Sequence, residues 1–275
     1  MPHMGLMVDS QCRHRYPYVH TRMKPRAMHT QLPSPQPPIV ESIDTAWQIW
    51  FQGVYCGQTH TWAYVETLLR PKTSTNRPSG TPSTIPPTTL REMDYAHLQR
   101  IIDRRWITHG SIPVAVNLAP VTLADPFFPA FAHRFIETPM VRSGRLIIEI
   151  TEHAIEHYLH DIIPVVRMLH EAGIRIFFDD IHRYPPLLTV LPAIPHDGAK
   201  VSYHAIATIG RDLRAIYRHH GHQMIVIEEI ETFAQYEETI RWMGTPWLQG
   251  YFLHRPSPVT DPLILPPHPT LDAME

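Results

Sequence analysis

Residues 146–180 read LIIEITEHAIEHYLHDIIPVVRMLHEAGIRIFFDD and contain one complete unit of the expected fold. The runs Leu146–Ile150 and Ile174–Phe178 are short and apolar, which is typical of buried strands. Between them, Ala154–Ala172 has the apolar spacing of an amphipathic helix. A strand, a helix and a second strand in this order predict a parallel pair joined by a crossover helix.

The same alternation continues on both sides of this unit. The other predicted strands are Gln48–Tyr55, Trp62–Leu69, Val114–Leu118, Ala199–Val201, Met224–Ile227 and Trp247–Leu248. The other predicted helices are Leu90–Trp106, Pro126–Ile136, a short one at Leu187–Leu191, Ala205–His219 and Phe233–Met243. The first two strands are close enough in sequence to form a hairpin, which adds one antiparallel strand. Close to eight strands, with no glycine-rich phosphate loop after any of them, favour a closed α/β fold, a TIM-like (β/α)8 barrel.

The two ends of the chain differ from this pattern. Residues 1–39 are rich in proline and histidine and have no sustained apolar period, which predicts a disordered arm. Residues 263–275 are predicted to be a flexible tail. Residues 40–262 are therefore expected to form one domain, and a chain of 275 residues suits one large barrel.

Composition excludes several classes of protein. A net charge of −2 gives no electrostatic footprint for duplex nucleic acid. The longest apolar runs are too short to span a bilayer, and the first residues lack the apolar core of a signal peptide. The only two cysteines, Cys12 and Cys56, provide no disulfide framework. A cytoplasmic location is therefore expected.

Nearly every predicted strand ends in a polar side chain that could bind a metal or move a proton. These residues are Asn117, Glu149, Asp179, Asp180, Lys200, Glu228 and Gln249, with Glu152 just beyond a strand and Glu66 inside the second hairpin strand. The carboxyl ends of barrel strands form one face, so we expect the residues to meet in a single mouth. One acid at a strand end is commonly a helix cap or a solvated charge. A series of such residues at successive strand ends is not explained in this way and indicates a functional site.

The chemistry of these residues points to hard cations. Clustered carboxylates repel one another unless cations neutralise them, and oxygen ligands suit Mg²⁺ or Mn²⁺. A pair such as Asp179 and Asp180 could hold two ions, an arrangement that supports phosphodiester hydrolysis. Lys200, at the next strand end, could orient or deprotonate the attacking water.

Short segments of the chain follow one another in the order of a known family. They are Phe51-Gln52, Glu66-Thr67-Leu68-Leu69-Arg70, Val116-Asn117-Leu118-Ala119-Pro120, Glu149-Ile150-Thr151-Glu152, Asp179-Asp180, Lys200, Glu228-Glu229-Ile230-Glu231-Thr232, Gln249-Gly250-Tyr251-Phe252 and Arg255-Pro256. Together they resemble the EAL family, the cyclic di-GMP phosphodiesterases, over most of Trp47–Pro258. Each segment is weak evidence alone, and their order makes the resemblance specific.

The resemblance implies a role for each position. The implied metal ligands are Glu66, Asn117, Glu149 and Asp179 for one Mg²⁺ or Mn²⁺, and Asp179, Asp180 and Glu228 for a second. Lys200 would assist the nucleophilic water and Gln249 would help to hold it, while Glu152 would brace the loop after Asp180. Gln52 and Arg70 would contact the substrate, with Glu231 supporting the site around it. The implied reaction is hydrolysis of cyclic di-GMP to linear pGpG.

The chain also departs from the family pattern. Ile181–Leu187 replaces a glycine-containing loop, and its two prolines remove backbone freedom and amide donors. The resemblance assigns that loop to the second metal and to a homodimer contact. Three further positions differ from the family pattern: Gly53 replaces a proline, Glu229 replaces a glycine, and Ser202 replaces an aspartate. A second interpretation is therefore a catalytically weak or inactive EAL domain that acts as a cyclic di-GMP receptor or binds a regulatory protein.

A third interpretation comes from a different motif. His153 and His157 flank Glu156 in a His-x-x-Glu-His pattern found in some zinc peptidases. On a continuous helix the two imidazoles would share one face. In a chain with 20 histidines the pattern can also arise by chance, and the segment follows Glu149–Glu152, where it would form an outer helix of the barrel.

Overall fold

The computed structural model describes residues 47–72, 85–103, 111–220, 224–244 and 246–258, with the side chains of 215–220 left aside. The predicted arm of residues 1–39 and the predicted tail of residues 263–275 lie outside these ranges. In the part of the chain that the structure describes, no helix has the length and apolar character needed to cross a membrane.

The described chain begins with an antiparallel hairpin. Strand β1 (Trp47–Cys56) pairs along its length with β2 (Thr61–Pro71), with an irregular register at Val54/Tyr55. Both strands are one or two residues longer at each end than predicted. In the register of the hairpin, Gln52 lies directly opposite Glu66.

Six parallel strands continue the sheet from β2. They are β3 (Val114–Leu118), β4 (Leu146–Ile150), β5 (Arg175–Phe178), β6 (Gly198–Ser202), β7 (Met224–Glu228) and β8 (Trp247–Leu248). Strand β1 pairs with both β2 and β8, so the sheet closes on itself into an eight-stranded barrel. Strand β9 (Ser257–Pro258) adds to the edge of β1. The predicted TIM-like barrel with one antiparallel strand is confirmed.

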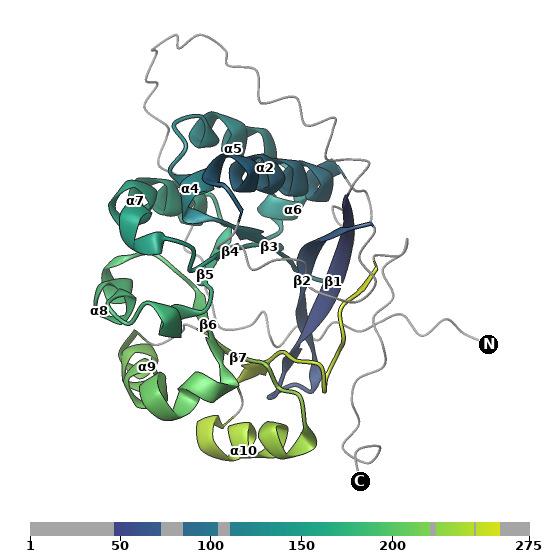
Figure 1. Cartoon of the computed structure of the whole chain (residues 1–275), viewed down its shortest axis with the longest axis vertical. Coiled ribbons are helices and arrows are strands. Elements are labelled where there is room, and N and C mark those ends of the chain that lie inside the picture. Colours follow the sequence, from purple (N-terminus) through teal and green to yellow (C-terminus); the bar gives the residue numbers. More distant parts are fainter. Residues whose placement is uncertain (1–46, 73–84, 104–110, 221–223, 245, 259–275) are drawn as a thin grey trace, which may run out of the picture.

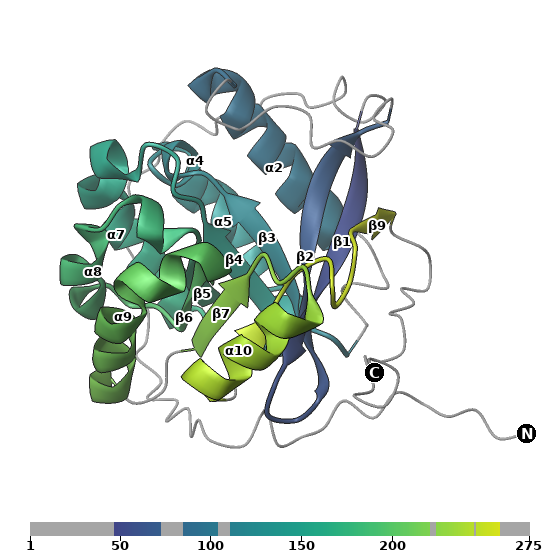
Figure 2. The same ribbon diagram turned by 60° about the horizontal axis from the view of Figure 1, so that its bottom comes forward.

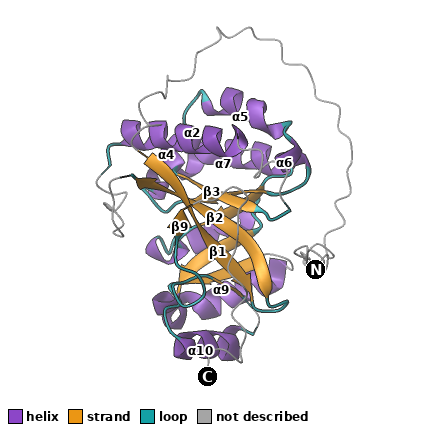
Figure 3. Ribbon diagram, turned by 90° about the vertical axis from the view of Figure 1, so that its right-hand side faces the viewer, coloured by secondary structure: helices purple, strands orange, loops and turns teal. Residues whose placement is uncertain are grey.

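In the described part of the chain, helices lie around the barrel on every side but that of the hairpin (Figures 1 and 3). The main helices are α2 (Pro87–Asp103), α5 (Phe128–Ile136), α7 (Ile155–Glu171), α9 (Ile206–His220) and α10 (Phe233–Met243). Shorter elements are α4 (Pro120–Leu123), α6 (Pro139–Arg142), α8 (Leu187–Val190) and the 3₁₀ turns η3 (Ile181–Arg183), η4 (Leu191–Ala193) and η5 (Tyr203–Ala205). The sequence analysis missed α4 and α6, each a single turn with proline in the first helical position, where its missing N–H costs nothing.

The apolar core has two layers. The outer layer packs the sheet against the helices and includes Leu118, Ile148, Phe178 and Val201. The inner layer fills the barrel below its mouth and comprises Val54, Cys56, Tyr64, Ala115, Ile147, Phe177, Val226 and Trp247. Each large apolar side chain that is fully buried stabilises the fold by on the order of 1.5–3 kcal/mol. The inner layer therefore provides a rigid floor for whatever lies above it.

Candidate functional site

The predicted site residues stand directly above the inner layer. Alternate residues of a strand point to the same face, so a residue two positions beyond an inner-layer residue also points into the barrel. The pairs, inner residue first, are Tyr64 and Glu66, Ala115 and Asn117, Ile147 and Glu149, Phe177 and Asp179, Gly198 and Lys200, Val226 and Glu228, and Trp247 and Gln249. Strands β3 to β8 end within two residues of this level, and the parallel strands run in one direction in Figure 2, so these residues lie at one end of the barrel.

Gly198 shows how tightly the floor is packed. A Cβ at this position would lie 2.7 Å from the carbonyl oxygen of Met224 and 2.8 Å from the ring of Phe177. Glycine is therefore needed where β6 passes the Phe177 ring. The close approach leaves Lys200 deep in the barrel, with 1% of its side chain exposed.

The ammonium of Lys200 is the centre of the site. Its Nζ lies 2.8 Å from Glu228 Oε1, 3.0 Å from Glu149 Oε2, 3.2 Å from Glu66 Oε2 and 3.4 Å from Asp179 Oδ1. These four carboxylates come from four different strands or strand ends. A single ammonium cannot balance four carboxylates, so the cluster carries excess negative charge if all of them are ionised.

Burial and mutual repulsion act on the acids of this cluster. Burial raises the pKa of Glu149 to about 8, although the Lys200 ammonium opposes the shift. Burial likewise raises the pKa of Asp179 and of Glu228. Burial opposes ionisation of Glu66 too, but Lys200 and hydrogen bonds hold its pKa below the usual value. Raised carboxylate pKa values in a shared pocket are the electrostatic sign of a site that gains from an added cation.

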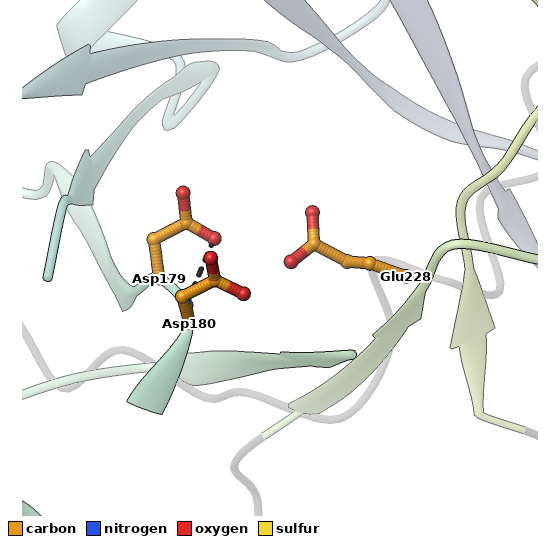
Figure 4. Close-up of side chains that lie close together, drawn as sticks. All are labelled: Asp179, Asp180 and Glu228. Atoms are coloured by element: carbon orange, nitrogen blue, oxygen red, sulfur yellow. Dashed lines mark hydrogen bonds between the residues drawn. The ribbon is translucent and has the colours of Figure 1, made fainter. Parts of the chain in front are cut away.

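Three carboxylates also meet at the outer side of the mouth. Ligand atoms of Asp179, Asp180 and Glu228 lie within 4.8 Å of one another, and Figure 4 shows Glu228 pointing across the mouth toward the two aspartates. Asp180 has a left-handed backbone conformation with φ of 43°. Its N–H donates to Asp179 Oδ1 at 3.1 Å, so the strained residue holds its neighbour in place.

Amide side chains connect the acids to strand β1. Asn117 Nδ2 donates to Glu66 Oε1 at 2.5 Å, and Gln249 Nε2 donates to Glu66 Oε2 at 2.6 Å. Gln249 Nε2 also donates to Gln52 Oε1 at 3.2 Å. Among the described residues, the buried Asn117 Oδ1 and Gln249 Oε1 accept no hydrogen bond. Unfilled amide oxygens beside carboxylates match the donor set of a hard divalent cation, so the residues fit the predicted metal type.

The remaining predicted residues lie around this cluster. Arg70 is on β2 four residues after Glu66, so both lie on the same face of the strand. Glu152 follows β4, and its Oε1 lies 3.6 Å from Arg183 Nη1, on the loop that it was predicted to brace. Glu231 is exposed, and its N–H donates to the Gln235 side chain at the start of α10.

Two residues that support the site were not predicted from the sequence. Tyr64 is fully buried, and its hydroxyl donates to Glu149 Oε1 at 2.7 Å. Its position two residues before Glu66 on a strand was a usable signal. His254 accepts the Gly53 N–H at Nδ1, 2.8 Å away, and its carbonyl accepts from Gln52 Nε2 at 2.9 Å. This contact joins residues about two hundred positions apart, so no local pattern could reveal it.

The structure corrects the zinc interpretation. Helix α7 begins at Ile155, and Ala154 before it is left-handed with φ of 51°. His153 therefore lies outside the helix on which it was predicted to share a face with His157. His157 is 74% exposed and faces its neighbour Glu156 at 3.8 Å. The predicted helix began one residue too early, at Ala154, and the left-handed backbone of Ala154 is what separates His153 from the helix.

Two departures from the family pattern contact each other. Ser202 donates a hydrogen bond to Glu229. Glu229, which replaces a glycine, keeps the left-handed conformation with φ of 60° that glycine adopts most easily. A carboxylate from the end of β7 therefore lies against Ser202 at the end of β6.

The fold and the site together define a class of protein: a (β/α)8 barrel in which carboxylates suited to binding cations gather around a buried lysine at the mouth. A profile of the EAL domain matches residues 44–256, which is most of the chain. The chain therefore belongs to the EAL domain family, as the sequence motifs predicted.

One curated protein is similar in sequence to part of the chain. An uncharacterized signaling protein of Caulobacter vibrioides is 32% identical over 154 residues, covering 53% of this chain and 19% of that protein. The chain thus spans about a fifth of the length of this curated relative.

Solved structures share the fold. An EAL domain protein from Listeria monocytogenes superimposes with a TM-score of 0.63 at 23% identity, covering 80% of this chain and 92% of the other. PaMucR phosphodiesterase in complex with c-di-GMP superimposes with a TM-score of 0.64 at 22% identity, covering 78% of this chain and 97% of the other. Klebsiella pneumoniae BlrP1 in complex with manganese and cyclic di-GMP superimposes with a TM-score of 0.64 at 20% identity, covering 77% of this chain and 56% of the other.

Proposed function

We propose that the chain hydrolyses cyclic di-GMP to linear pGpG in the mouth of the barrel, with two Mg²⁺ or Mn²⁺ ions. The observation that carries this proposal is the convergence of Glu66, Glu149, Asp179 and Glu228 within 3.4 Å of Lys200 Nζ. Membership of the EAL family supports the substrate.

The ligands proposed for the ions form two groups. Glu66, Asn117, Glu149 and Asp179 would hold one ion, and Asp179, Asp180 and Glu228 would hold the other. When bound, these ions supply Lewis-acid polarisation of the phosphodiester and of the attacking water. The unfilled oxygen of Asn117 and the close approach of the Asp179, Asp180 and Glu228 oxygens support the assignment.

The side chains of the chain itself would organise the hydrolysis. The attacking water would give up one proton as its oxygen bonds to phosphorus. The bond from phosphorus to the 3′ oxygen would break, and that oxygen would take up one proton, so the net addition is one water. Lys200 would orient the water with its ammonium hydrogens, and Gln249 would hold it with its amide oxygen, which accepts no hydrogen bond from the described residues. Glu228 would act both as ligand and as a carboxylate beside the reacting water. Glu152 would keep the loop after Asp180 in position through Arg183.

Other residues would bind the nucleotide. Gln52 is 7% exposed and hydrogen-bonded to Gln249, so it borders the reacting centre. Arg70 would pair with a phosphate or a guanine edge, for which its planar guanidinium is suited. Glu231 would support this surface from the segment after β7.

A second candidate function rests on the loop after Asp180. Ile181–Leu187 lacks glycine, and Arg183 from this loop is 2.9 Å from Asp180. An EAL domain with an impaired second metal position would act as a cyclic di-GMP receptor or bind a regulatory protein. We further propose that residues 40–262 form the EAL domain, that it works in the cytoplasm and that it can form a homodimer, which its mass in solution would test.

The test is hydrolysis of cyclic di-GMP with Mg²⁺ or Mn²⁺, followed as pGpG by chromatography. Wild type is compared with Glu66→Ala and with Glu156→Ala, which removes a half-exposed carboxylate outside the mouth. We expect product from wild type and Glu156→Ala, and loss of at least a hundredfold in Glu66→Ala. Binding without product in calorimetry would favour the receptor function. Neither product nor nucleotide binding would reject hydrolysis and the receptor function, and would leave binding of a regulatory protein as the remaining candidate.

A further inference from the structure

The loop after Asp180 folds back over that residue. Ile181–Arg183 forms the single 3₁₀ turn η3, and the Arg183 N–H donates to the Asp180 carbonyl at 2.9 Å. In a 3₁₀ turn, residues three apart are eclipsed, so the side chain of Arg183 is carried over Asp180. Pro185 follows and cannot continue the turn.

Both carboxylate oxygens of Asp180 face basic side chains of this turn. Arg183 Nε lies 2.9 Å from Asp180 Oδ2, and His182 Nδ1 lies 3.6 Å from Oδ1. Arg183 also reaches Glu152, with Nη1 3.6 Å from Oε1. Asp179 and Glu228 differ from Asp180, because the cation that they contact is Lys200, inside the barrel.

We propose that Arg183 is a built-in counter-ion that competes with a divalent cation for Asp180. The consequence is that the outer position of the site, formed by Asp179, Asp180 and Glu228, binds its ion more weakly than the inner position around Glu66 and Glu149. This inference rests on the proposed metal-dependent function and assigns Arg183 the control of its second ion.

Charge and geometry give the competition its direction. A guanidinium within hydrogen-bond distance uses the oxygen that a metal would take, and its positive charge repels a dication nearby. The side chain of Arg183 is 57% exposed, so it can swing into water when an ion arrives. Arg183 therefore lowers the affinity of the outer position and does not close it.

Calorimetric titration of the nucleotide-free protein with Mn²⁺ tests this directly, because it counts ions without requiring turnover. Four proteins are compared: wild type, Arg183→Gln, Arg183→Lys and Arg142→Gln. Arg183→Lys keeps the charge. Arg142 pairs with Glu137 just before β4, at the opposite end of the barrel from the mouth, so Arg142→Gln is a control for loss of an exposed charge.

We expect two binding steps, with the weaker one about five- to tenfold tighter in Arg183→Gln and unchanged in Arg142→Gln. Arg183→Lys should stay within about twofold of wild type. Equal second-step affinities in wild type and Arg183→Gln would overturn the inference while leaving the proposed function intact. Absence of any Mn²⁺ binding in all four proteins would overturn the proposed metal-dependent function, and the inference with it.

Discussion

The buried hydroxyl of Tyr64 donates to Glu149, 85 residues away in sequence, at 2.7 Å. Tyr64 belongs to the inner layer, where it packs edge-on against Phe177 and beside Trp247. The hydrogen bond therefore links the rigid floor of the barrel to a carboxylate that also contacts Lys200. The orientation of Glu149 is therefore set both by the Tyr64 hydroxyl of the inner layer and by the Lys200 ammonium.

Replacing Tyr64 by phenylalanine should lower the free energy of unfolding by about 1–3 kcal/mol, because a buried carboxylate oxygen loses its donor. Urea unfolding of Tyr64→Phe beside wild type measures the effect. Tyr158→Phe, on the outer helix α7, is the matched control and should change stability little. An unchanged unfolding midpoint in Tyr64→Phe would show that Glu149 needs no support from the floor.

Removing the charge of Lys200 should make the protein depend on divalent cations for its stability. In Lys200→Met without metal, the facing carboxylates lose their shared cation, and breaking a buried ion pair typically costs about 3–5 kcal/mol. Mg²⁺ should restore more stability to this variant than to wild type. Thermal unfolding in EDTA and in Mg²⁺ measures both, with Lys72→Met, at an exposed position, as the control. Equal gains from Mg²⁺ in Lys200→Met and wild type would contradict the expectation.

Asp94 gives the fold a specific dependence on pH. It is buried, its Oδ2 accepts from Ala119 N and Thr122 Oγ1, and burial raises its pKa to about 7. The folded state thus binds a proton more tightly than the unfolded state, whose carboxyl has a pKa near 3.8. The resulting stability is complete below about pH 4 and is lost as pH rises through about 7, with an upper bound of about 4 kcal/mol.

Asp94→Asn should remove this dependence, because an amide keeps an acceptor oxygen and never ionises. Relative to wild type, the variant should gain stability between pH 5 and pH 8 in urea unfolding. Asp161→Asn, at a position 66% exposed, should follow wild type at both pH values. Parallel curves for wild type and Asp94→Asn would mean that Asp94 does not titrate in this range.

His254 should control how Gln52 meets the nucleotide. Its ring packs against Phe51 and Trp62, and its Nδ1 accepts the Gly53 N–H, so Nδ1 must be unprotonated. Burial lowers the pKa of His254, which keeps it in this form. In His254→Ala we expect cyclic di-GMP to bind about tenfold more weakly while Mn²⁺ binding is unchanged.

Isothermal titration with each ligand separates these two effects. His60→Ala is the control, because His60 contacts Tyr55 at the far end of the same hairpin. His254→Asn offers an amide acceptor and should recover part of the lost affinity. A loss of Mn²⁺ binding in His254→Ala would show a general collapse of the mouth, and unchanged nucleotide affinity would show that Gln52 needs no such support.

Sequence alone determined the elements, their order and the identity of the residues at the strand ends. Leu146–Ile150 and Trp247–Leu248 were predicted to the residue, because a short apolar run between turn signals is a local property. The convergence of Asn117, Glu149 and Asp179 followed from the topology of a parallel barrel, in which all strand ends of one polarity share a face.

Only the tertiary structure decided which groups touch. Lys200 faces acids from four other strands or strand ends, and the register and closure of the sheet set those distances. The turn that carries Arg183 onto Asp180 and the contact between Gly53 and His254 are likewise geometric. Hydrophobic periodicity fixes which face a side chain occupies within its own element. The partner across the barrel depends on how distant strands are aligned, and that information is distributed over the whole packed core.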